Sequence, residues 1–235
     1  MLKFTLAAGL AIAALSTAAN AADIVHPPSM VTSSSAASWS GFYAGVNGGY
    51  GPGTASSGYY DGEGAVSFSG LFLGGQLGYN FQLENGLVFG LEGDLNWSNE
   101  SGTTSTSEDG GEYTYSSTDT LNWFGAVTGH VGYAWDTFEP YVLAGVAFAN
   151  NNIAEHENDY GDIYDSSSTA NHLGFTVGAG AAAMLTNNIS AFTEVRYSNY
   201  GSANYTTTYD YGNETTTAPV SLVDTMVRGG LNFHF

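Results

Sequence analysis

The sequence has very few basic residues: its 235 residues include 3 Lys and Arg against 22 Asp and Glu, a net charge of −19. Proteins that bind nucleic acid neutralise phosphates with Lys and Arg, so this balance excludes nucleic acid as a partner. The sequence also has no Cys, which excludes a disulfide framework, a thiol nucleophile and cysteine-ligated zinc. Charged residues make up only 11% of the chain, against about 25% in typical soluble domains, so an ordinary water-facing surface is not expected.

Long apolar runs are also missing. The one continuous apolar stretch, residues 4–14, follows Lys3 and precedes the small-residue site Ala19-Asn20-Ala21. This three-part pattern predicts a signal peptide over residues 1–21 that is cleaved after Ala21. The alternative, a transmembrane anchor, is weaker because the run is shorter than the roughly 20 residues that span a bilayer.

The mature chain divides into a short lead-in and a repetitive domain. Residues 22–38 contain Pro27, Pro28 and a run of three serines, which is typical of a flexible segment, here a periplasmic N-terminal lead-in. Residues 39–235 alternate between apolar and small or polar positions with a period of two, which predicts β-strands. The predicted strands are residues 39–50, 67–83, 86–98, 120–135, 140–150, 170–185, 189–200 and 220–235.

The connections between these strands alternate strictly in length. Three are short, at residues 84–86, 136–139 and 186–188, and four are long, at residues 51–66, 99–119, 151–169 and 201–219. This order predicts an antiparallel meander with all short turns at one end and long polar loops at the other.

The chemistry of the two strand faces decides between a soluble and a membrane protein. In segment 120–135, Leu121, Trp123 and Val127 share the apolar face, and in segment 86–98 Glu92 and Asp94 share the opposite face. A soluble β-sandwich or lipocalin-like barrel would carry many charges on its polar face. Here that face is mostly Gly, Ala, Ser, Thr and Asn, which suits a narrow interior, whereas the apolar face with aromatics near both strand ends suits lipid.

Backbone groups in lipid must be paired within the protein, so the sheet must close. The sequence therefore predicts an all-β fold: an eight-stranded antiparallel up-and-down transmembrane β-barrel over residues 39–235.

Several stretches also resemble a known family. The opening strand WSGFYAGVNGGYG (39–51), the segment FGLEGDLNW (89–97), the central segments 123–135 and 140–147, and the closing VRGGLNFHF (227–235) resemble the small alphaproteobacterial outer-membrane immunogenic or porin-family surface proteins, which are OmpA-like transmembrane β-barrels. The resemblance implies the outer membrane of a Gram-negative cell as location. It also implies that Phe233 and the terminal Phe235 form an assembly signal for the barrel-assembly machinery. The alternation through these two aromatics agrees with lipid-facing positions.

A cluster of polar side chains is predicted inside the barrel. Counted from the short-turn end, Glu92, His130, Glu194, Arg196 and Arg228 fall at similar heights, and Asp94 lies on the same face as Glu92. Strand adjacency allows Glu92 to meet His130, and Glu194 and Arg196 to meet Arg228. One interpretation is a gated pore or proton path; the favoured one is a buried charge network that plugs the lumen, because eight strands leave room only for side chains.

No catalytic, cofactor-binding or metal-ligating residues are predicted. No serine is placed by spacing to act with His130 and Glu92, and the five His residues are too scattered for haem. The acids between Asp159 and Asp165 do not match the ligand spacing of a calcium-binding EF-hand loop.

The four long connections carry most of the acidic residues, many tyrosines and no Lys or Arg. Such a composition is typical either of solvated loops or of adaptable recognition surfaces. We therefore expect a non-enzymatic outer-membrane surface protein with a structural role and a possible extracellular ligand, embedded in outer-membrane lipid and lipopolysaccharide. The alternative is a narrow porin-type channel for small solutes or ions; an outer-membrane enzyme or haem receptor is the third.

Overall fold

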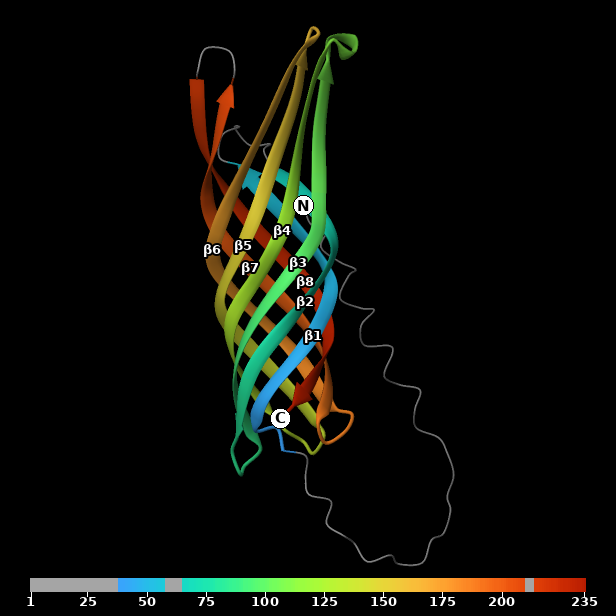
Figure 1. Ribbon diagram of the computed structural model, residues 1–235, viewed down its shortest axis with the longest axis vertical. Coiled ribbons are helices and arrows are strands. Elements are labelled where there is room, and N and C mark those ends of the chain that lie inside the picture. The colour runs from blue at the N-terminus through green and yellow to red at the C-terminus, as the bar shows by residue number, and fades with distance from the viewer. Residues whose placement is uncertain (1–37, 58–64, 210–213) are drawn as a thin grey trace, which may run out of the picture. The chain divides into compact units, whose positions relative to one another are not determined.

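A computed structural model describes residues 38–57, 65–209 and 214–235, so the predicted signal peptide and nearly all of the lead-in lie outside the described residues. Eight strands, each antiparallel to the next, form one closed barrel, and β1 pairs with β8 to complete the ring (Figure 1). The strands are β1 (Gly41–Ser57), β2 (Ala65–Gln82), β3 (Leu87–Glu108), β4 (Tyr113–Tyr133), β5 (Phe138–Asp159), β6 (Asp162–Met184), β7 (Ile189–Tyr209) and β8 (Glu214–His234). The predicted fold class is confirmed. Among the described residues, no helix is long and apolar enough to span a membrane.

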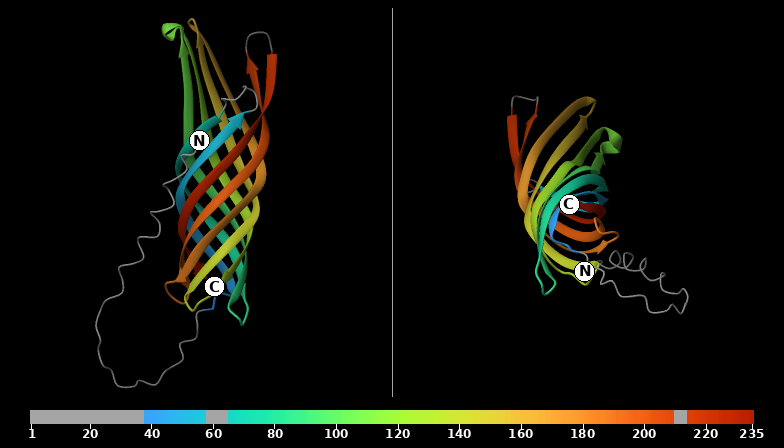
Figure 2. Two further views of the ribbon diagram at one scale, coloured as in Figure 1. Left: turned by 180° about the vertical axis from the view of Figure 1, so that it is seen from behind. Right: turned by 60° about the horizontal axis from the view of Figure 1, so that its bottom comes forward.

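The turns that join β2 to β3, β4 to β5 and β6 to β7 lie at one end of the barrel, together with the C-terminus (Figures 1 and 2). These are the three connections that the sequence predicts to be short. In the first of them Gly86 has a φ of 88°, a value that favours glycine, and its N–H donates to the Leu83 carbonyl at 3.0 Å.

The opposite end differs from the prediction. The sequence predicts long loops at residues 99–119, 151–169 and 201–219. Instead, β3 continues to Glu108 and β4 begins at Tyr113, and β7 continues to Tyr209 and β8 begins at Glu214. Strands β5 and β6 meet across the two-residue turn Tyr160-Gly161. Both turn residues have positive φ, as a tight hairpin requires. The prediction failed because both faces of these ribbons are polar, so they lack apolar alternation, although Thr and Tyr favour strands.

Above the middle of the barrel, strand pairing no longer continues around the whole ring. The pairing of β6 with β7 stops at Phe175↔Asn199, whereas the pairing of β5 with β6 continues to Asp159↔Asp162. The pairing of β2 with β3 likewise stops at Ser69↔Ser101, so β3–β6 rise further as a four-stranded sheet (Figure 1). We call the extensions of β3–β4 and β5–β6 above this level, residues 102–119 and 152–169, the outer ribbons.

Large apolar side chains cover the outside of the closed part of the barrel. Leu77 is 69% exposed, and similarly outward-facing residues occur on every strand. Aromatics gather near both edges of this belt: Phe42, Tyr79, Phe81, Tyr133, Trp135 and Phe138 toward the short turns, and Tyr50, Trp97, Phe175 and Tyr197 toward the outer ribbons. An apolar belt between two aromatic rings is the surface that a transmembrane barrel presents to lipid.

One side chain expected in this belt lies inside the barrel. Leu121 is fully buried because the register of β4 against β5 shifts between Leu121 and Trp123, and that of β3 against β4 shifts between Trp97 and Glu100. A bulge exchanges the two faces of a strand beyond it. The simple alternation therefore predicts the lower part of each strand better than the upper part.

The lumen is filled by three layers. An apolar cluster around Phe72, Phe124, Leu222 and Met226 occupies the upper part, and a second around Trp39, Val88 and Phe192 occupies the part near the short turns. Polar and charged side chains fill the space between them. This filling agrees with the narrow interior of an eight-stranded barrel.

The position of the belt leads to a testable prediction. Leu77→Arg places a charge against lipid near the middle of the belt and is expected to destabilise the barrel by about 2–4 kcal/mol. Ile163 on the outer ribbon is 62% exposed but faces water, so Ile163→Arg is the matched control, with an expected change within about 0.5 kcal/mol. Urea unfolding in lipid vesicles measures both values, and equal effects of the two substitutions would contradict the assigned belt.

Candidate functional site

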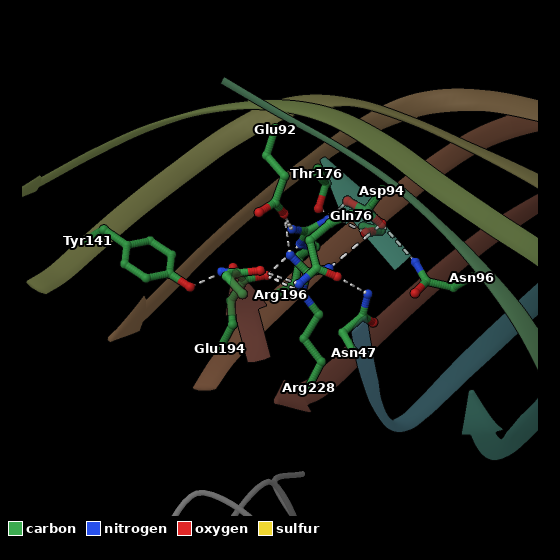
Figure 3. A network of polar contacts seen from close by, with 12 residues as sticks. Asn47, Gln76, Glu92, Asp94, Asn96, Tyr141, Thr176, Glu194, Arg196 and Arg228 are labelled. Atoms are coloured by element: carbon green, nitrogen blue, oxygen red, sulfur yellow. Dashed lines mark hydrogen bonds and ion pairs between the residues drawn. The ribbon is translucent and has the colours of Figure 1, made fainter. Parts of the chain in front are cut away.

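The middle layer of the lumen holds an ionic network built from three strands. Glu92 and Asp94 lie on β3, Glu194 and Arg196 on β7, and Arg228 on β8, all at inward-facing positions (Figure 3). Successive inward positions on a strand are two residues apart, so each of β3 and β7 contributes two neighbouring charges. These five residues and His130 form the interior cluster that the sequence predicts, and the structure brings the five into contact.

Glu194 joins the two arginines. Its Oε1 atom accepts hydrogen bonds from Nε of Arg196 at 2.7 Å and from Nε of Arg228 at 2.8 Å. Arg228 pairs directly with Glu194 in the register of β7 against β8. One carboxylate oxygen therefore holds two guanidinium groups side by side despite their mutual repulsion.

The carboxylates of β3 complete the network from across the lumen. Nη1 of Arg196 donates to Oδ2 of Asp94 at 2.7 Å, and Nη2 of Arg228 donates to Oε1 of Glu92 at 2.7 Å. Two longer contacts connect the pairs crosswise, Arg196 to Glu92 at 3.7 Å and Arg228 to Asp94 at 3.8 Å. Strands β3 and β7 lie on different sides of the ring, so these bonds cross the lumen.

Neutral donors satisfy the remaining carboxylate oxygens. Tyr43 donates to Oε2 of Glu92 at 2.8 Å, Tyr141 donates to Oε2 of Glu194 at 3.1 Å, and Asn96 donates to Oδ1 of Asp94 at 2.7 Å. These three residues are not among those that the sequence predicts for the cluster. A signal was present for the tyrosines, because each is a bulky inward-facing residue opposite a glycine of the next strand, Gly78 and Gly180.

Contrary to the prediction, His130 lies outside the ionic network. Its Nε2 lies 3.8 Å from Oε1 of Glu139, and its ring lies 5.3 Å from that of Tyr141, between centroids. In the register, His130 lies opposite Gly90, one inward position nearer the short turns than Glu92. His130, Glu139 and Glu92 line one small cavity of about 30 Å³ below the network.

A second polar cluster lies above the lipid belt, at the base of the outer ribbons. The Asn151 amide donates to Oδ1 of Asp119 at 2.8 Å and to the Tyr205 hydroxyl at 3.1 Å, and a ring nitrogen of His172 lies 2.9 Å from the same hydroxyl. Burial raises the pKa of Asp119 and raises the pKa of Tyr205 to about 12. Asp119, which the sequence placed in a loop, therefore belongs to the interior.

The two predicted assembly residues lie at the end of β8 beside the short turns. Both Phe233 and Phe235 point outward, their rings are in edge contact at 5.3 Å, and the Phe235 N–H donates to the Phe42 carbonyl at 3.0 Å. Their side chains are thus accessible at the belt's lower edge.

The ionic network is suited to closing the lumen rather than to binding a metal or cofactor. All five of its charged groups are engaged with one another, and the described part of the chain contains no group of three or more His, Asp or Glu side chains placed to hold a metal ion. Paired, hydrogen-bonded charges persist in a buried site, whereas unpaired ones do not.

Comparison with known proteins agrees with this architecture. Residues 5–223 match the family model described as outer membrane protein beta-barrel domain. The chain is 32% identical to the 31 kDa outer-membrane immunogenic protein of Brucella melitensis, over 95% of this chain and 96% of that protein. It is 36% identical to the 22 kDa outer membrane protein of Rhizobium leguminosarum, over 72% of this chain and 68% of that protein.

Among solved structures, the fold is similar to that of the outer membrane protease OmpT from Escherichia coli. The TM-score is 0.52 at 13% identity, and the match covers 83% of this chain and 97% of that one. At this identity the likeness concerns the fold alone.

The charge balance of the network gives the next prediction. Arg228→Met leaves one arginine to face three buried carboxylates, and we expect a loss of about 3–5 kcal/mol of unfolding free energy. Glu194→Gln leaves two arginines and two carboxylates, so its cost is expected to be smaller.

Urea unfolding in vesicles measures the free energy of unfolding of both variants. Arg228→Lys is the control, because it keeps the positive charge but loses the several N–H donors of the guanidinium group. A cost of Arg228→Met no greater than that of Glu194→Gln would contradict the charge argument.

Proposed function

The chain belongs to the outer membrane protein beta-barrel domain family, and on this premise we propose that it closes its own lumen and uses its outer ribbons to contact ligands outside the cell. The protein is an integral surface protein of the Gram-negative outer membrane and is surrounded there by lipid and lipopolysaccharide. The single observation that carries the proposal is the contrast between a filled lumen and two long ribbons that rise beyond the lipid belt.

The contents of the lumen support a structural rather than a conducting barrel. Arg228 is 2% exposed, and the apolar residues Leu121, Leu222 and Met226 above it are buried as well. An ion would have to displace the cross-lumen bonds of the network and then pass an apolar layer, both of which are unfavourable. The narrow channel therefore remains the second candidate.

The outer ribbons have the composition of a recognition surface. Their described acids with exposed side chains include Glu108, Glu112, Asp159, Asp162 and Asp165, and no Lys or Arg occurs in either ribbon. At the tip of the β5–β6 ribbon, Tyr160 and Ile163 stand exposed among these acids. A ligand with a basic surface and some apolar contact area is the chemistry that such a tip would attract.

We make two further proposals, one about catalysis and one about assembly into the membrane. We propose that it is not an enzyme, because the charged groups of the ionic network are engaged with one another. We also propose that the barrel-assembly machinery reads the exposed Phe233 and Phe235. Truncation of Phe235 should then reduce the folded fraction in the cell but not refolding in vitro.

Planar bilayer recordings test the closed lumen. The refolded protein is expected to give no discrete openings, because the network and the upper apolar layer block the path. Arg228→Ala opens space in the network and serves as the comparison, with gel mobility before and after boiling as the check that both proteins fold. Regular single-channel openings of the unmodified protein would favour the porin alternative.

A binding measurement tests the ribbons. The triple substitution Asp159→Asn, Asp162→Asn and Asp165→Asn at the β5–β6 tip should lower the affinity for fluorescent polylysine by roughly tenfold, equivalent to about 1.4 kcal/mol, and less at high salt. Glu84→Gln at the opposite end of the barrel is the matched control. It should leave the affinity for polylysine added to the outside of intact cells unchanged. Unchanged binding by the tip variant would remove the electrostatic role of this ribbon.

A further inference from the structure

The outer face of the β3–β6 sheet carries a row of three asparagines. The Asn122 amide on β4 donates to Oδ1 of Asn150 on β5 at 2.9 Å, and the Asn150 amide donates to Oδ1 of Asn171 on β6 at 2.8 Å. We call these three residues the amide row. Asn150 and Asn171 are partners in the strand register, and Asn122 lies at the β4 bulge. The bulge that turns Leu121 inward thus also brings Asn122 into the row.

The amide row lies directly above the lipid belt. The outward residues that follow its members toward the short turns are Trp123, Phe148 and Leu173, and Leu173 is 71% exposed. The rings of Trp123 and Phe148 are in contact at 6.2 Å, and Trp97 of β3, 66% exposed, is the register partner of Trp123. Aromatic rings mark the membrane interface, so the amides above them lie at the level of the lipid headgroups.

Above the amide row the outer face stays polar but uncharged along β6. The Asn152 amide donates to the Ser167 hydroxyl at 3.0 Å and to the Thr169 hydroxyl at 2.8 Å. The first charged outward side chain on this strand is Asp165, which lies about 20 Å beyond Asn171 along the strand. Amides and hydroxyls therefore separate the lipid belt from the acids of the ribbon tip.

This surface offers no cation to a phosphate group. Arg196 and Arg228 are bound to the carboxylates of the ionic network, and Lys3 lies in the predicted signal peptide. The headgroup of lipopolysaccharide consists of phosphorylated sugars, and proteins hold phosphates chiefly with Arg and Lys. Sugar hydroxyls both donate and accept hydrogen bonds, as side-chain amides do. The surface therefore fits the sugars of this headgroup rather than its phosphates.

The amide row keeps hydrogen-bonding groups available for a ligand. Each asparagine has two N–H donors and a carbonyl oxygen, and each bond of the row uses one donor and one acceptor. Within the described residues, the N–H groups of Asn171 and Oδ1 of Asn122 make no hydrogen bond. The bonds between the amides hold the row in place before a ligand arrives, and the Trp97 ring below it offers an apolar face to the C–H groups of a sugar.

We propose that the amide row, with Trp97 and Trp123 beneath it, binds the saccharide headgroup of one lipopolysaccharide molecule of the surrounding membrane. The acyl chains of that molecule lie against the apolar belt below, so the site continues an interface that the barrel already has. The site lies on the side where the β3–β6 sheet rises furthest, and it is separate from the ribbon tips (Figure 1).

Fluorescence anisotropy of labelled lipopolysaccharide, dispersed in excess detergent, measures its binding to the refolded protein. Asn150→Ala with Asn171→Ala should lower the affinity about tenfold, because the hydrogen bonds of two amides to the sugars are lost. Asn204→Ala is the matched control: Asn204 is an exposed asparagine of β7 outside the row, and its substitution should leave the affinity unchanged. Gel mobility with and without boiling shows that all three proteins fold.

The same measurement separates recognition of sugars from recognition of phosphates. Enzymatic removal of the lipopolysaccharide phosphates, addition of a chelator and an increase in salt should each leave the affinity unchanged, because neutral amides make the contacts. Loss of binding after dephosphorylation or chelation would show that divalent cations bridge phosphates to the acids of the chain. That result, unchanged affinity of the double variant, or absence of binding by the unmodified protein would overturn the proposal.

Discussion

The architecture depends on the requirement that every backbone N–H and C=O in hydrocarbon be paired within the chain. A meander of strands meets this requirement only if its first and last members pair, as β1 and β8 do from Tyr43↔His234 to Ser57↔Val220. Above the lipid belt water satisfies free edges, and there the ring opens between β6 and β7. The point at which the barrel stops being closed thus marks the point at which the surrounding solvent changes.

Closure of the sheet also creates the interior that the charges must occupy. Eight strands enclose a space that side chains fill almost completely, so the polar side chains of the lumen have to satisfy one another. Two arginines and three carboxylates do this in the middle, with phenols and amides at the remaining oxygens.

Much of the site could be predicted from face alternation. Inward positions at similar heights placed Glu92, Glu194, Arg196 and Arg228 in one interior cluster with His130, and Asp94 was added because it shares the inward face of Glu92. The pairing of the β3 carboxylates with the two arginines across the lumen was not predicted. The contact of His130 with Glu139 of β5 was not predicted, because the sequence placed residues 136–139 in a short turn and Glu92 on the strand that neighbours His130. Glu100 and Asp119 were assigned to loops because bulges at the upper rim interrupt the alternation that would have shown them facing inward.

Face alternation and composition were sufficient to predict the strand number, the order of short turns, the lipid-facing surface and the charged residues that form the ionic network. Each of these follows from a period of two and from the near absence of basic residues. The folded barrel was needed to show how far the strands continue into water and which oxygens each arginine contacts. These features depend on register and on contacts across the ring, between residues as far apart in the chain as Asp94 and Arg196.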